Sequence, residues 1–590
     1  MKDFPAQYDL QAEDVLYFPH IPKTAGMTFR TILEDQFCSS DICPATLNAQ
    51  LKGYTQADYE KYRLFRGHIN YVDIPQILSH KHLLLVTVLR EPIARVISHY
   101  EYIRRMPGDP HYGLVKDMTL EEFAQGMPVG RLGKNAQTYY IAKLAQFDLN
   151  HLSPDEALAL AKKQLDSLAF IGILERFQDS LFLLSYIFGW NPIINSRREN
   201  VAKDKKPKEE IPASTLEAIK QNCLLDVELY QYAKELFEIR FTQMQQDLLS
   251  KYGSLVEAQL SVDPMPIQIT KELLERHAEQ RFLKLNPAIS SSLGYDFIDP
   301  LRGTGWHRRE TLNEHSGYRW IGPEPMSTLD FPISSDEDVV VEIKTICNYA
   351  ITQDVADSLT LDVNGYPIPL EILYSDRGSS VRWFRGVIPK IALDNGRVFS
   401  QFTFQVNRVV PFTEVNPLNP DPREVGLAIN TLKIFPVHAA KLESAALSVF
   451  DLKSWSDVAN FVEKHLEPGD KIAAPLVFQL KLPGEVLDYQ TAFSKKVDFQ
   501  WLILYKGTIE NLNSILFNLL LHRFSPVFAD GNFVVFVRQK KLPKLSFLAL
   551  HVRALYEDRI KVPIKLYLIR QLKQIKSFFV RSSTQVEIES

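Results

Sequence analysis

The sequence predicts an α/β protein: a mostly parallel sheet with covering helices, followed by an antiparallel β-sandwich and a small α/β domain. Two short apolar runs, Val15–Phe18 and Leu83–Leu89, each lead into a loop and then a helical pattern, which is the order of a parallel sheet with crossover helices. Between about residues 290 and 440, Gly and Pro separate short alternating runs, and Asn364-Gly365 is a hairpin-turn signal. Mixed helix and strand patterns return after about residue 445.

The length of 590 residues favours about three domains, at roughly 150 residues per domain. Changes in the residue pattern along the sequence set the predicted domain boundaries. We expect the parallel-sheet domain at 1–255, a helical linker at 256–289, the sandwich at 290–440, the small α/β domain at 441–545 and a basic helical tail at 546–590. No internal repeat is visible.

Individual elements follow from periodicity. Apolar residues at helical spacing predict helices over Asp155–Leu168, Leu216–Tyr252, Lys271–Leu285, Val458–Leu466 and Leu512–Leu521. Short alternating or β-branched runs predict strands over Val339–Ile343, Leu359–Val363, Phe402–Val406, Trp501–Leu504 and Phe533–Val537. The tail from Arg559 to Arg581 carries seven Lys or Arg residues and no acidic residue, interleaved with apolar side chains. It is either a helix docked on its own chain or a peripheral contact with an anionic membrane surface.

Composition excludes several classes of protein. Hydrophobic residues make up 45% and charged residues 23%, which is globular rather than disordered. The net charge of −4 argues against a nucleic-acid partner. Four cysteines are too few for a disulfide scaffold and fit a reducing compartment. There is no signal-like leader and no apolar run long enough for a transmembrane span, so we expect a cytoplasmic protein. Cys38 and Cys43 lack a second ligand pair, and no metal site is predicted.

The segment after Val15–Phe18 has the composition of a phosphate-binding loop. Small residues at Ala25 and Gly26 let backbone N–H groups approach a ligand, and a helix N-terminus adds unpaired donors. Lys23 adds a positive charge. The flanking Thr24, Met27 and Thr28 complete the candidate loop. The Gly-Lys-Ser/Thr ending of a Walker A loop is absent, so nucleotide hydrolysis is the weaker hypothesis.

A second candidate anion site follows Leu83–Leu89. Arg90 comes directly after the strand, Pro92 suits a first helical turn, and Ser98 lies about two turns into the helix. Ligands of open α/β sheets bind at the carboxyl ends of the strands. A guanidinium and a hydroxyl at that edge suit a phosphate monoester.

His20-Ile-Pro-Lys-Thr-Ala-Gly26 and Leu89-Arg-Glu-Pro-Ile-Ala-Arg-Val-Ile-Ser-His-Tyr100 together resemble the two cofactor signatures of the Golgi-type carbohydrate sulfotransferases, specifically the heparan-sulfate and uronyl O-sulfotransferases and their bacterial relatives. Three further segments fit: Arg66-Gly-His68, Asn135-Ala-Gln-Thr138, and Phe170 to Phe177 with Arg197-Arg-Glu-Asn200. The resemblance covers about residues 13 to 250. It implies a P-loop-like fold and 3′-phosphoadenosine 5′-phosphosulfate (PAPS) as the sulfuryl donor.

The resemblance also implies roles for single residues. Lys23 would contact the bridging oxygen and stabilise the departing phosphate. Arg90 and Ser98 would bind the 3′-phosphate, and His68 would take the proton from the acceptor hydroxyl. Some family members have a second histidine where this chain has Arg66, which leaves the acceptor open. The 5′-phosphate would be cradled, mainly through backbone, by Thr24, Ala25, Gly26, Met27 and Thr28.

The predicted function is therefore sulfuryl transfer to a carbohydrate hydroxyl. Two alternatives stay open: a nucleotide-dependent kinase using the same loop, and a non-catalytic glycan-binding scaffold. Aromatic residues of the sandwich, Trp306, Tyr318 and Trp320, either stack on sugar rings or pack in the core. Tyr139 and Tyr140 line an acceptor groove or fill the core. The basic residues Arg197, Arg198, Lys203 and Lys205 close over an anion or lie in solvent.

Overall fold

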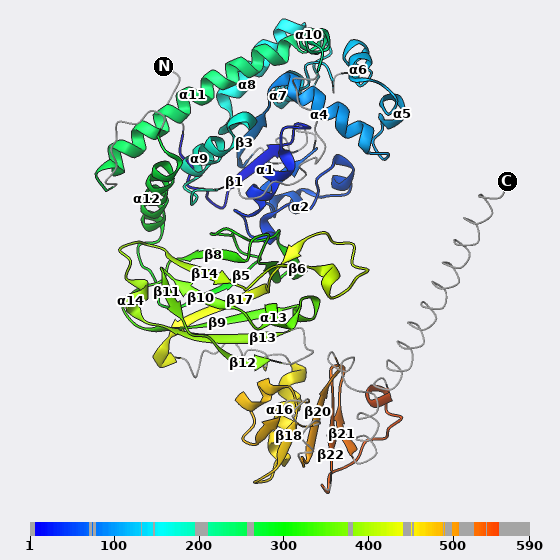
Figure 1. Cartoon of the computed structure of the whole chain (residues 1–590), viewed down its shortest axis with the longest axis vertical. Coiled ribbons are helices and arrows are strands. Elements are labelled where there is room, and N and C mark those ends of the chain that lie inside the picture. Colours follow the sequence, from blue (N-terminus) through cyan, green and yellow to red (C-terminus); the bar gives the residue numbers. More distant parts are fainter. Residues whose placement is uncertain are drawn as a thin grey trace, which may run out of the picture.

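The computed structural model describes residues 6–69, 80–130, 133–145, 148–194, 211–255, 265–375, 381–439, 453–487, 498–506, 524–538 and 540–553, with Ile74, Leu78, Phe450, Tyr489 and Ala492. Three folded regions follow one another along the long axis of the molecule (Figure 1). Separate clusters of buried side chains fill them. The predicted helix Leu512–Leu521, most of the tail and the four basic residues from Arg197 to Lys205 lie outside the described residues.

The first region contains the predicted parallel sheet. Its four strands are β1 (Asp14–Pro19), β2 (Leu64–Gly67), β3 (His82–Leu89) and β4 (Phe170–Ile173), in the spatial order β2-β1-β3-β4. All three pairings are parallel. Every residue of β1 is buried, which explains why this strand is a continuous apolar run rather than an alternating one.

Helices cover this sheet (Figure 1). The predicted helix Leu216–Tyr252 is two helices, α10 and α11, because the helical conformation is interrupted at Cys223. The described helices of this region are α1 (Gly26–Glu34), α2 (Gln56–Glu60), α4 (Pro92–Arg105), α5 (Tyr112–Val115), α6 (Leu120–Gly126), α7 (Ala136–Ala145), α8 (Pro154–Ser167), α9 (Phe177–Phe188), α10 (Ala213–Asn222), α11 (Leu224–Tyr252) and α12 (Ile267–Leu285).

Helix α12 occupies most of the predicted linker, yet it packs as part of the first region. Leu273 and Leu274 are buried in the same core as the parallel sheet. The ring of His277 stacks on Tyr186 of α9, with centroids 4.8 Å apart. Arg281 donates to the Tyr186 carbonyl (3.0 Å) and pairs with Asp9. The helix is therefore fixed to the sheet domain rather than suspended between domains.

The second region is built from antiparallel sheets, as predicted. One sheet has the order β11-β10-β14-β8, and the larger one runs β12-β13-β9-β17-β7-β6, with β5 also paired to β17. The strands are β5 (Leu293–Asp296), β6 (Glu310–Asn313), β7 (Ser316–Trp320), β8 (Met326–Phe331), β9 (Val339–Ile346), β10 (Thr360–Val363), β11 (Tyr366–Ile368), β12 (Glu371–Ser375), β13 (Arg382–Ile388), β14 (Ser400–Gln405) and β17 (Ala428–Pro436). The short strands β15 (Val410–Pro411) and β16 (Glu424–Val425) form a separate pair, and the short helices are α13 (Gln353–Ala356) and α14 (Lys390–Leu393).

The predicted hairpin turn is present between β10 and β11. Val363 pairs with Tyr366. Both central residues have positive φ, 52° at Asn364 and 85° at Gly365. These angles suit the mirror-image turns that follow the twist of two antiparallel strands, which is why Asn-Gly was informative.

The sandwich is joined to the C-terminal end of α1 by buried polar contacts. Arg319, 1% exposed, pairs with Asp35. Arg309 donates to the carbonyl oxygens of Glu34 (3.4 Å) and Phe37 (2.9 Å). The N–H of Leu301 donates to the Asp35 carbonyl at 2.7 Å. The sandwich thus satisfies backbone groups that the end of a helix leaves unpaired.

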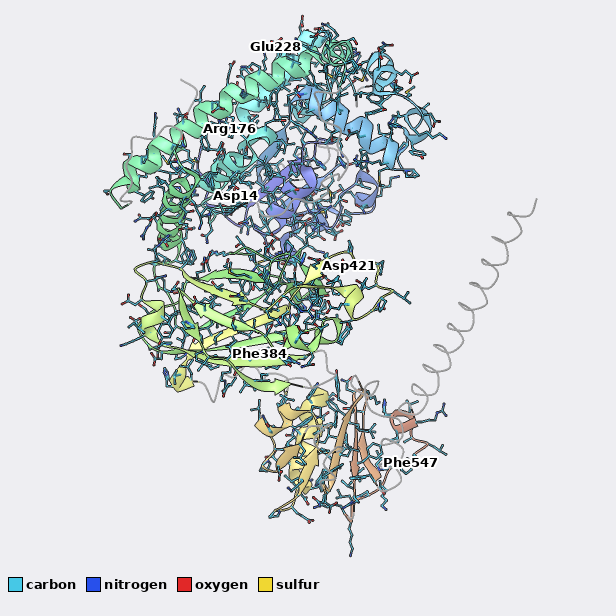
Figure 2. The ribbon with its side chains drawn as sticks, viewed as in Figure 1. Asp14, Arg176, Glu228, Phe384, Asp421 and Phe547 are labelled. Carbon is cyan, nitrogen blue, oxygen red and sulfur yellow. The ribbon has the colours of Figure 1, made fainter. Side chains whose placement is uncertain are left out.

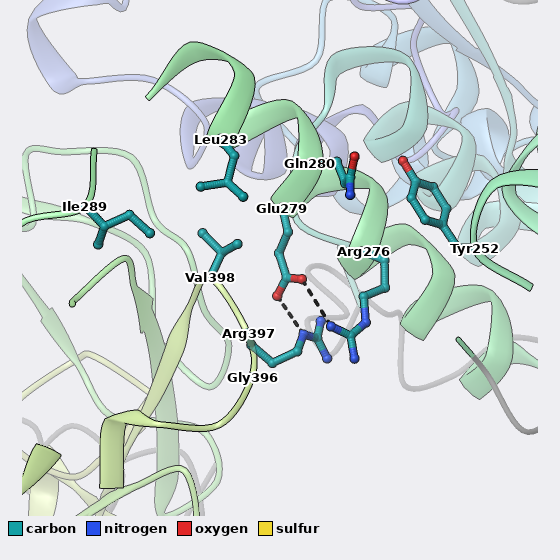
Figure 3. A pocket seen from close by; sticks show the side chains of 9 residues that line it. All are labelled: Tyr252, Arg276, Glu279, Gln280, Leu283, Ile289, Gly396, Arg397 and Val398. Carbon is teal, nitrogen blue, oxygen red and sulfur yellow. Dashed lines mark hydrogen bonds and ion pairs between the residues drawn. The ribbon is translucent and has the colours of Figure 1, made fainter. Parts of the chain in front are cut away.

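A cavity of about 370 Å³ lies where α12 meets the sandwich (Figure 3). Its charged side chains pair with one another: Glu279 accepts from Arg397 at 2.7 Å and lies 3.7 Å from Arg276. Leu283 and Val398 face each other across it. The cavity holds none of the sequence-predicted site residues, and its ion pairs connect the two regions.

The third region is a mixed sheet of order β19-β18-β20-β22-β21, which fits the predicted small α/β domain. Strands β18, β19 and β20 pair in parallel, and β22 pairs antiparallel to β20 and β21. The elements are α16 (Lys453–His465), β18 (Lys471–Ala473), β19 (Glu485–Leu487), β20 (Trp501–Tyr505), β21 (Ser525–Ala529) and β22 (Phe533–Val537). Across the described residues, no helix has the length and apolarity needed to cross a membrane. All four cysteines are free thiols.

Candidate active site

Three neighbouring strands deliver the predicted site residues to one edge of the sheet. β1 lies between β2 and β3, and all three strands run in the same direction. The loop carrying Lys23 follows β1, Arg90 follows β3, and His68 follows β2. Because carboxyl ends of parallel strands share an edge, the three side chains start from adjacent positions.

The loop after β1 has a constrained backbone. Lys23 and Ala25 both have positive φ, 71° and 61°, a conformation that is uncommon for residues other than Gly. Thr24 is fully buried, and its hydroxyl donates to the Ile21 carbonyl at 2.9 Å. That hydroxyl therefore helps to hold the loop in shape.

Helix α1 begins at Gly26 without a side-chain cap at its preceding residue, Ala25. The first bond of the helix runs from the Phe29 N–H to the Ala25 carbonyl. Helices leave their first N–H groups unpaired, so the donors of Gly26, Met27 and Thr28 are available to an anion at the positive end of the helix dipole. Thr28 is buried and Met27 is exposed.

Gly26 is required by a close approach of His20. A Cβ added at Gly26 would lie 1.8 Å from two atoms of the His20 ring, so no larger residue fits without displacing that ring. On its other side, His20 stacks on His68, with ring centroids 4.4 Å apart and planes inclined by 21°. His20 thus joins the phosphate loop to the candidate base, a contact that sequence reasoning missed.

Both imidazoles are held in their neutral form. Burial, together with the nearby His68 and Lys23, lowers the pKa of His20 to about 3. The residue His68 is exposed, yet partial loss of hydration lowers its pKa below 6.5. A hydrogen bond with the His20 backbone opposes this shift. The His68 N–H donates to the Thr46 carbonyl at 2.8 Å, which fixes the backbone here.

Lys23 and Arg90 meet directly. The Arg90 guanidinium donates from Nη1 to the Lys23 carbonyl at 3.0 Å. The Lys23 ammonium lies 4.2 Å from the centre of the Tyr102 ring on α4, a cation–π distance. The two cations predicted to bind opposite ends of one nucleotide therefore belong to a single cluster.

Gln137 clamps the backbone of Arg90. Its amide oxygen accepts from the Arg90 N–H at 2.9 Å, and its amide nitrogen donates to the Arg90 carbonyl at 2.8 Å. The Gln137 side chain is 1% exposed. This buried side chain therefore holds the backbone of Arg90 in place.

A buried carboxylate supports the clamp from behind. Asp226, at the start of α11, accepts from the N–H groups of Gln137 (3.1 Å) and Thr138 (2.8 Å) and from the Thr138 hydroxyl (2.8 Å). In return, Asn135 accepts from the N–H groups of Leu225 and Asp226. The N-termini of α7 and α11 thus cap each other. Asp226 was missed, because its role depends on a contact 89 residues away.

Helix α4 carries Ser98, the second residue of the candidate anion site after β3. Glu91 caps it by accepting from the N–H groups of Ile93 (3.0 Å) and Ala94 (2.7 Å), and Pro92 occupies the first turn as predicted. Ser98 is half-buried two turns further on. The capping fixes the direction in which α4 leaves the Arg90 strand end.

Arg66 is a structural residue. It is 5% exposed and pairs with Glu34 at 2.7 Å, while it also donates to the carbonyl oxygens of Cys43 and Ala45. The same carboxylate accepts from Arg30 at 2.7 Å, and these cations hold its pKa below the usual range although burial opposes them. Arg66 thus braces β2 against α1 rather than facing an acceptor.

Two of the three aromatic residues named as sugar-stacking candidates are core residues, whereas Tyr318 is partly buried and donates from its hydroxyl to Glu310 at 2.7 Å. Trp306 is fully buried and donates from its indole to the Thr328 carbonyl at 2.8 Å, and Trp320 is 3% exposed. Neither indole presents a face to a ligand, so stacking of these two residues on sugars is ruled out. Tyr139 and Tyr140 are partly buried against the core of the sheet domain.

The sequence comparisons agree with this geometry. Residues 6–238 match the model of the sulfotransferase family. Human heparan-sulfate 6-O-sulfotransferase 3 is 24% identical over 293 residues, covering 40% of this chain and 60% of the human protein. Chicken heparan-sulfate 6-O-sulfotransferase 2 is 25% identical over 293 residues, covering 40% and 70%. A protein-tyrosine sulfotransferase from Arabidopsis thaliana is 34% identical over 91 residues, covering 15% and 17%.

The region that contains the parallel sheet thus matches the sulfotransferase family and is similar in sequence to heparan-sulfate 6-O-sulfotransferases. The chain spans about 60% of the length of the human relative. The match to the family model ends at residue 238, so it does not include the sandwich or the small α/β domain. Among solved structures, mouse sulfotransferase SULT7A1 complexed with PAP aligns over 47% of this chain and 91% of its own, with 13% identity and a TM-score of 0.19.

Proposed function

We propose that this protein transfers a sulfuryl group from PAPS to a carbohydrate hydroxyl. The observation that carries the proposal is the convergence of Lys23, Arg90 and His68 on one edge of the parallel sheet, with Arg90 bonded to the Lys23 carbonyl. The relatives that bear the name heparan-sulfate 6-O-sulfotransferase support a glycosaminoglycan-like acceptor.

The residues present fit the donor. The uncapped start of α1 offers backbone N–H groups, and Lys23 adds a full charge, which together match a 5′-phosphosulfate. The forked guanidinium of Arg90 matches a 3′-phosphate, and we place Ser98 beside it. When bound, PAPS supplies the sulfuryl group and an anionic leaving group.

The remaining chemistry belongs to the side chains. Charge grows on the leaving oxygen during an in-line transfer, and Lys23, held beside it, stabilises that charge without reorganising. His68 accepts the proton of the attacking hydroxyl, and its neutral imidazole is the form required of a base. No step in this scheme calls for a metal ion.

Calorimetry and turnover test the proposal together. We expect 3′-phosphoadenosine 5′-phosphate to bind more tightly than ATP, and labelled PAPS to sulfate members of a glycan panel. We expect Lys23→Ala to lower kcat by about 10²–10³-fold, as for loss of one preorganised donor, while Lys23→Arg keeps part of the rate. Tighter binding of ATP would favour a kinase, and donor binding without transfer to any glycan would favour a scaffold.

A further inference from the structure

The last described segment of the chain presents an exposed apolar tip, formed by residues 545–550. Leu548 and Leu550 are 79% and 75% exposed, and Leu545 and Phe547 are 36% and 44% exposed. Phe547 lies at the outer side of the third region (Figure 2). Isolated exposed apolar residues are common on protein surfaces, but four within six positions form a patch that calls for a partner.

Both ends of the tip are fastened to the domain. The Leu545 N–H donates to the carbonyl of Pro526 in β21 at 2.8 Å. Val552 is fully buried in the cluster that contains Leu502 and Phe524. Within the tip, the Leu548 N–H donates to the Ser546 hydroxyl oxygen at 3.1 Å. The outward direction of the apolar side chains is therefore built into the fold.

The charged residues that directly flank the tip, within residues 540–553, are all basic. Lys541, Lys544 and Arg553 are exposed on either side of it, and no Asp or Glu occurs between residues 540 and 553. After Glu557 and Asp558, the sequence continues with the seven basic residues of 559–581, a stretch that contains no acid. A chain with a net charge of −4 thus concentrates positive charge where it exposes its apolar tip.

We propose that the tip at residues 545–550 inserts into an anionic membrane surface. Phe and Leu side chains enter the boundary between headgroups and acyl chains, while the flanking lysines and Arg553 contact anionic headgroups. A patch that was only apolar would fit a second copy of the chain equally well. The surrounding positive charge disfavours self-association by like-charge repulsion and favours a lipid surface. This proposal does not depend on the sulfotransferase assignment.

Vesicle sedimentation with the full chain tests the proposal. We expect binding to vesicles of phosphatidylcholine with 30 mol% phosphatidylserine, a composition chosen as roughly that of an anionic leaflet, weakened by salt and weak on phosphatidylcholine alone. A triple variant, Phe547→Ser, Leu548→Ser and Leu550→Ser, is expected to bind at least about tenfold more weakly, because three apolar side chains no longer leave water.

A matched control uses apolar side chains that are equally exposed elsewhere. Ile391 and Leu418 of the sandwich are 72% and 75% exposed, and their replacement by Ser should leave vesicle binding unchanged. Circular dichroism and a thermal melt establish that the triple variant is folded. Equal binding by the triple variant and the parent chain would overturn the proposal and assign any affinity to the remaining tail. A dimer that the triple variant abolishes, without vesicle binding, would assign the tip to a second copy.

Discussion

The guanidinium of Arg90 donates a hydrogen bond to the carbonyl of Lys23 across 3.0 Å, although the two residues are 67 positions apart. This contact ties the end of β3 to the loop after β1. Any anion held by Arg90 is therefore held at a fixed place relative to the Lys23 loop. One substitution at Arg90 should affect both halves of the proposed donor site.

Arg90→Ala should weaken binding of 3′-phosphoadenosine 5′-phosphate by roughly 1.5–3 kcal/mol, as expected for a charged hydrogen bond. Arg90→Lys should recover only part of this, because an ammonium lacks the fork. Arg105→Ala, which removes an exposed cation at the end of α4, the helix that follows Arg90, is the control. Isothermal titration calorimetry measures all three, and an unchanged Kd for Arg90→Ala would remove this residue from the site.

Gln137→Glu tests the clamp on Arg90. The substitution keeps an oxygen to accept from the Arg90 N–H but sets a second oxygen against the Arg90 carbonyl, where the amide nitrogen now donates at 2.8 Å. We expect the KM for PAPS to rise at least about tenfold, from about 1–2 kcal/mol of lost and repulsive contact, with a smaller change in kcat. The KM of Gln137→Met should lie between those of the parent and Gln137→Glu.

Gln125→Glu, on the exposed surface of α6, makes the same chemical change away from the site and should leave both constants unaltered. If Gln137→Glu lowered both kcat and thermal stability but left KM unchanged, Gln137 would serve only the fold.

His68→Ala should lower kcat by about 10²–10⁴-fold, the usual contribution of a positioned base, while the Kd of 3′-phosphoadenosine 5′-phosphate stays the same. Because the pKa of His68 is lowered by loss of hydration, its neutral form persists below pH 6.5. In the parent enzyme, log kcat/KM should therefore be flat near neutrality and fall only at lower pH. His151→Ala, at an exposed site, is the control, and retention of the acid limb in His68→Ala would assign it to another group.

His277 should make the protein acid-sensitive. Burial lowers its pKa to about 4 in the folded chain, whereas an unfolded histidine titrates near 6.5. As pH falls through this window, the unfolded state takes up a proton that the folded state refuses, so stability is lost. The destabilisation from this one group is about 2 kcal/mol between pH 7 and pH 5.

Replacing His277 by Phe keeps an aromatic ring for the stack on Tyr186 and removes the titrating group. The stability of this variant relative to the parent should then improve by about 2 kcal/mol from pH 7 to pH 5, measured by urea denaturation. His315→Phe, at a side chain 86% exposed, should show no such gain. A constant difference across pH would contradict the assignment.

Arg319→Met should strongly destabilise the junction between the sheet domain and the sandwich. The substitution leaves the Asp35 carboxylate without its buried partner, and such losses cost about 3–5 kcal/mol. Adding Asp35→Leu should recover much of this, since a buried ion pair and an apolar pair are often similar in stability. The surface pair of Arg408 and Asp354 offers the control, because Arg408→Met should change the unfolding midpoint little.

The elements that the sequence predicted well are those with a local signal. Val15–Phe18 and Leu83–Leu89 became β1 and β3 within one residue at each end, and Asn364-Gly365 became the expected turn. The break at Cys223 was missed, because helical periodicity runs through it and the reason for the break is a contact between α7 and α11.

The candidate site likewise contains residues that the sequence could predict and residues that it could not. Lys23 and Arg90 each follow a predicted strand, so their meeting at one edge of a parallel sheet could be inferred from the sequence. The strand β2, which precedes His68, was not predicted. The side chains that orient them have no recognisable local sequence pattern. Gln137 and Tyr102 act through tertiary contacts, and Asp226 lies at the start of a helix 89 residues beyond Gln137. The roles of single residues in transfer, and the cytoplasmic location, stay predictions.

The grip of Arg309 and Arg319 on the end of α1 limits how the chain can be divided. The same helix carries the candidate cradle at one end and is fastened to the sandwich at the other. A shortened protein that stops after residue 255 would lose those arginines and also α12, leaving Asp35, the Phe37 carbonyl and the α9 surface open to water. A shortened protein for work on the parallel-sheet domain would therefore need to retain α12 together with Arg309 and Arg319.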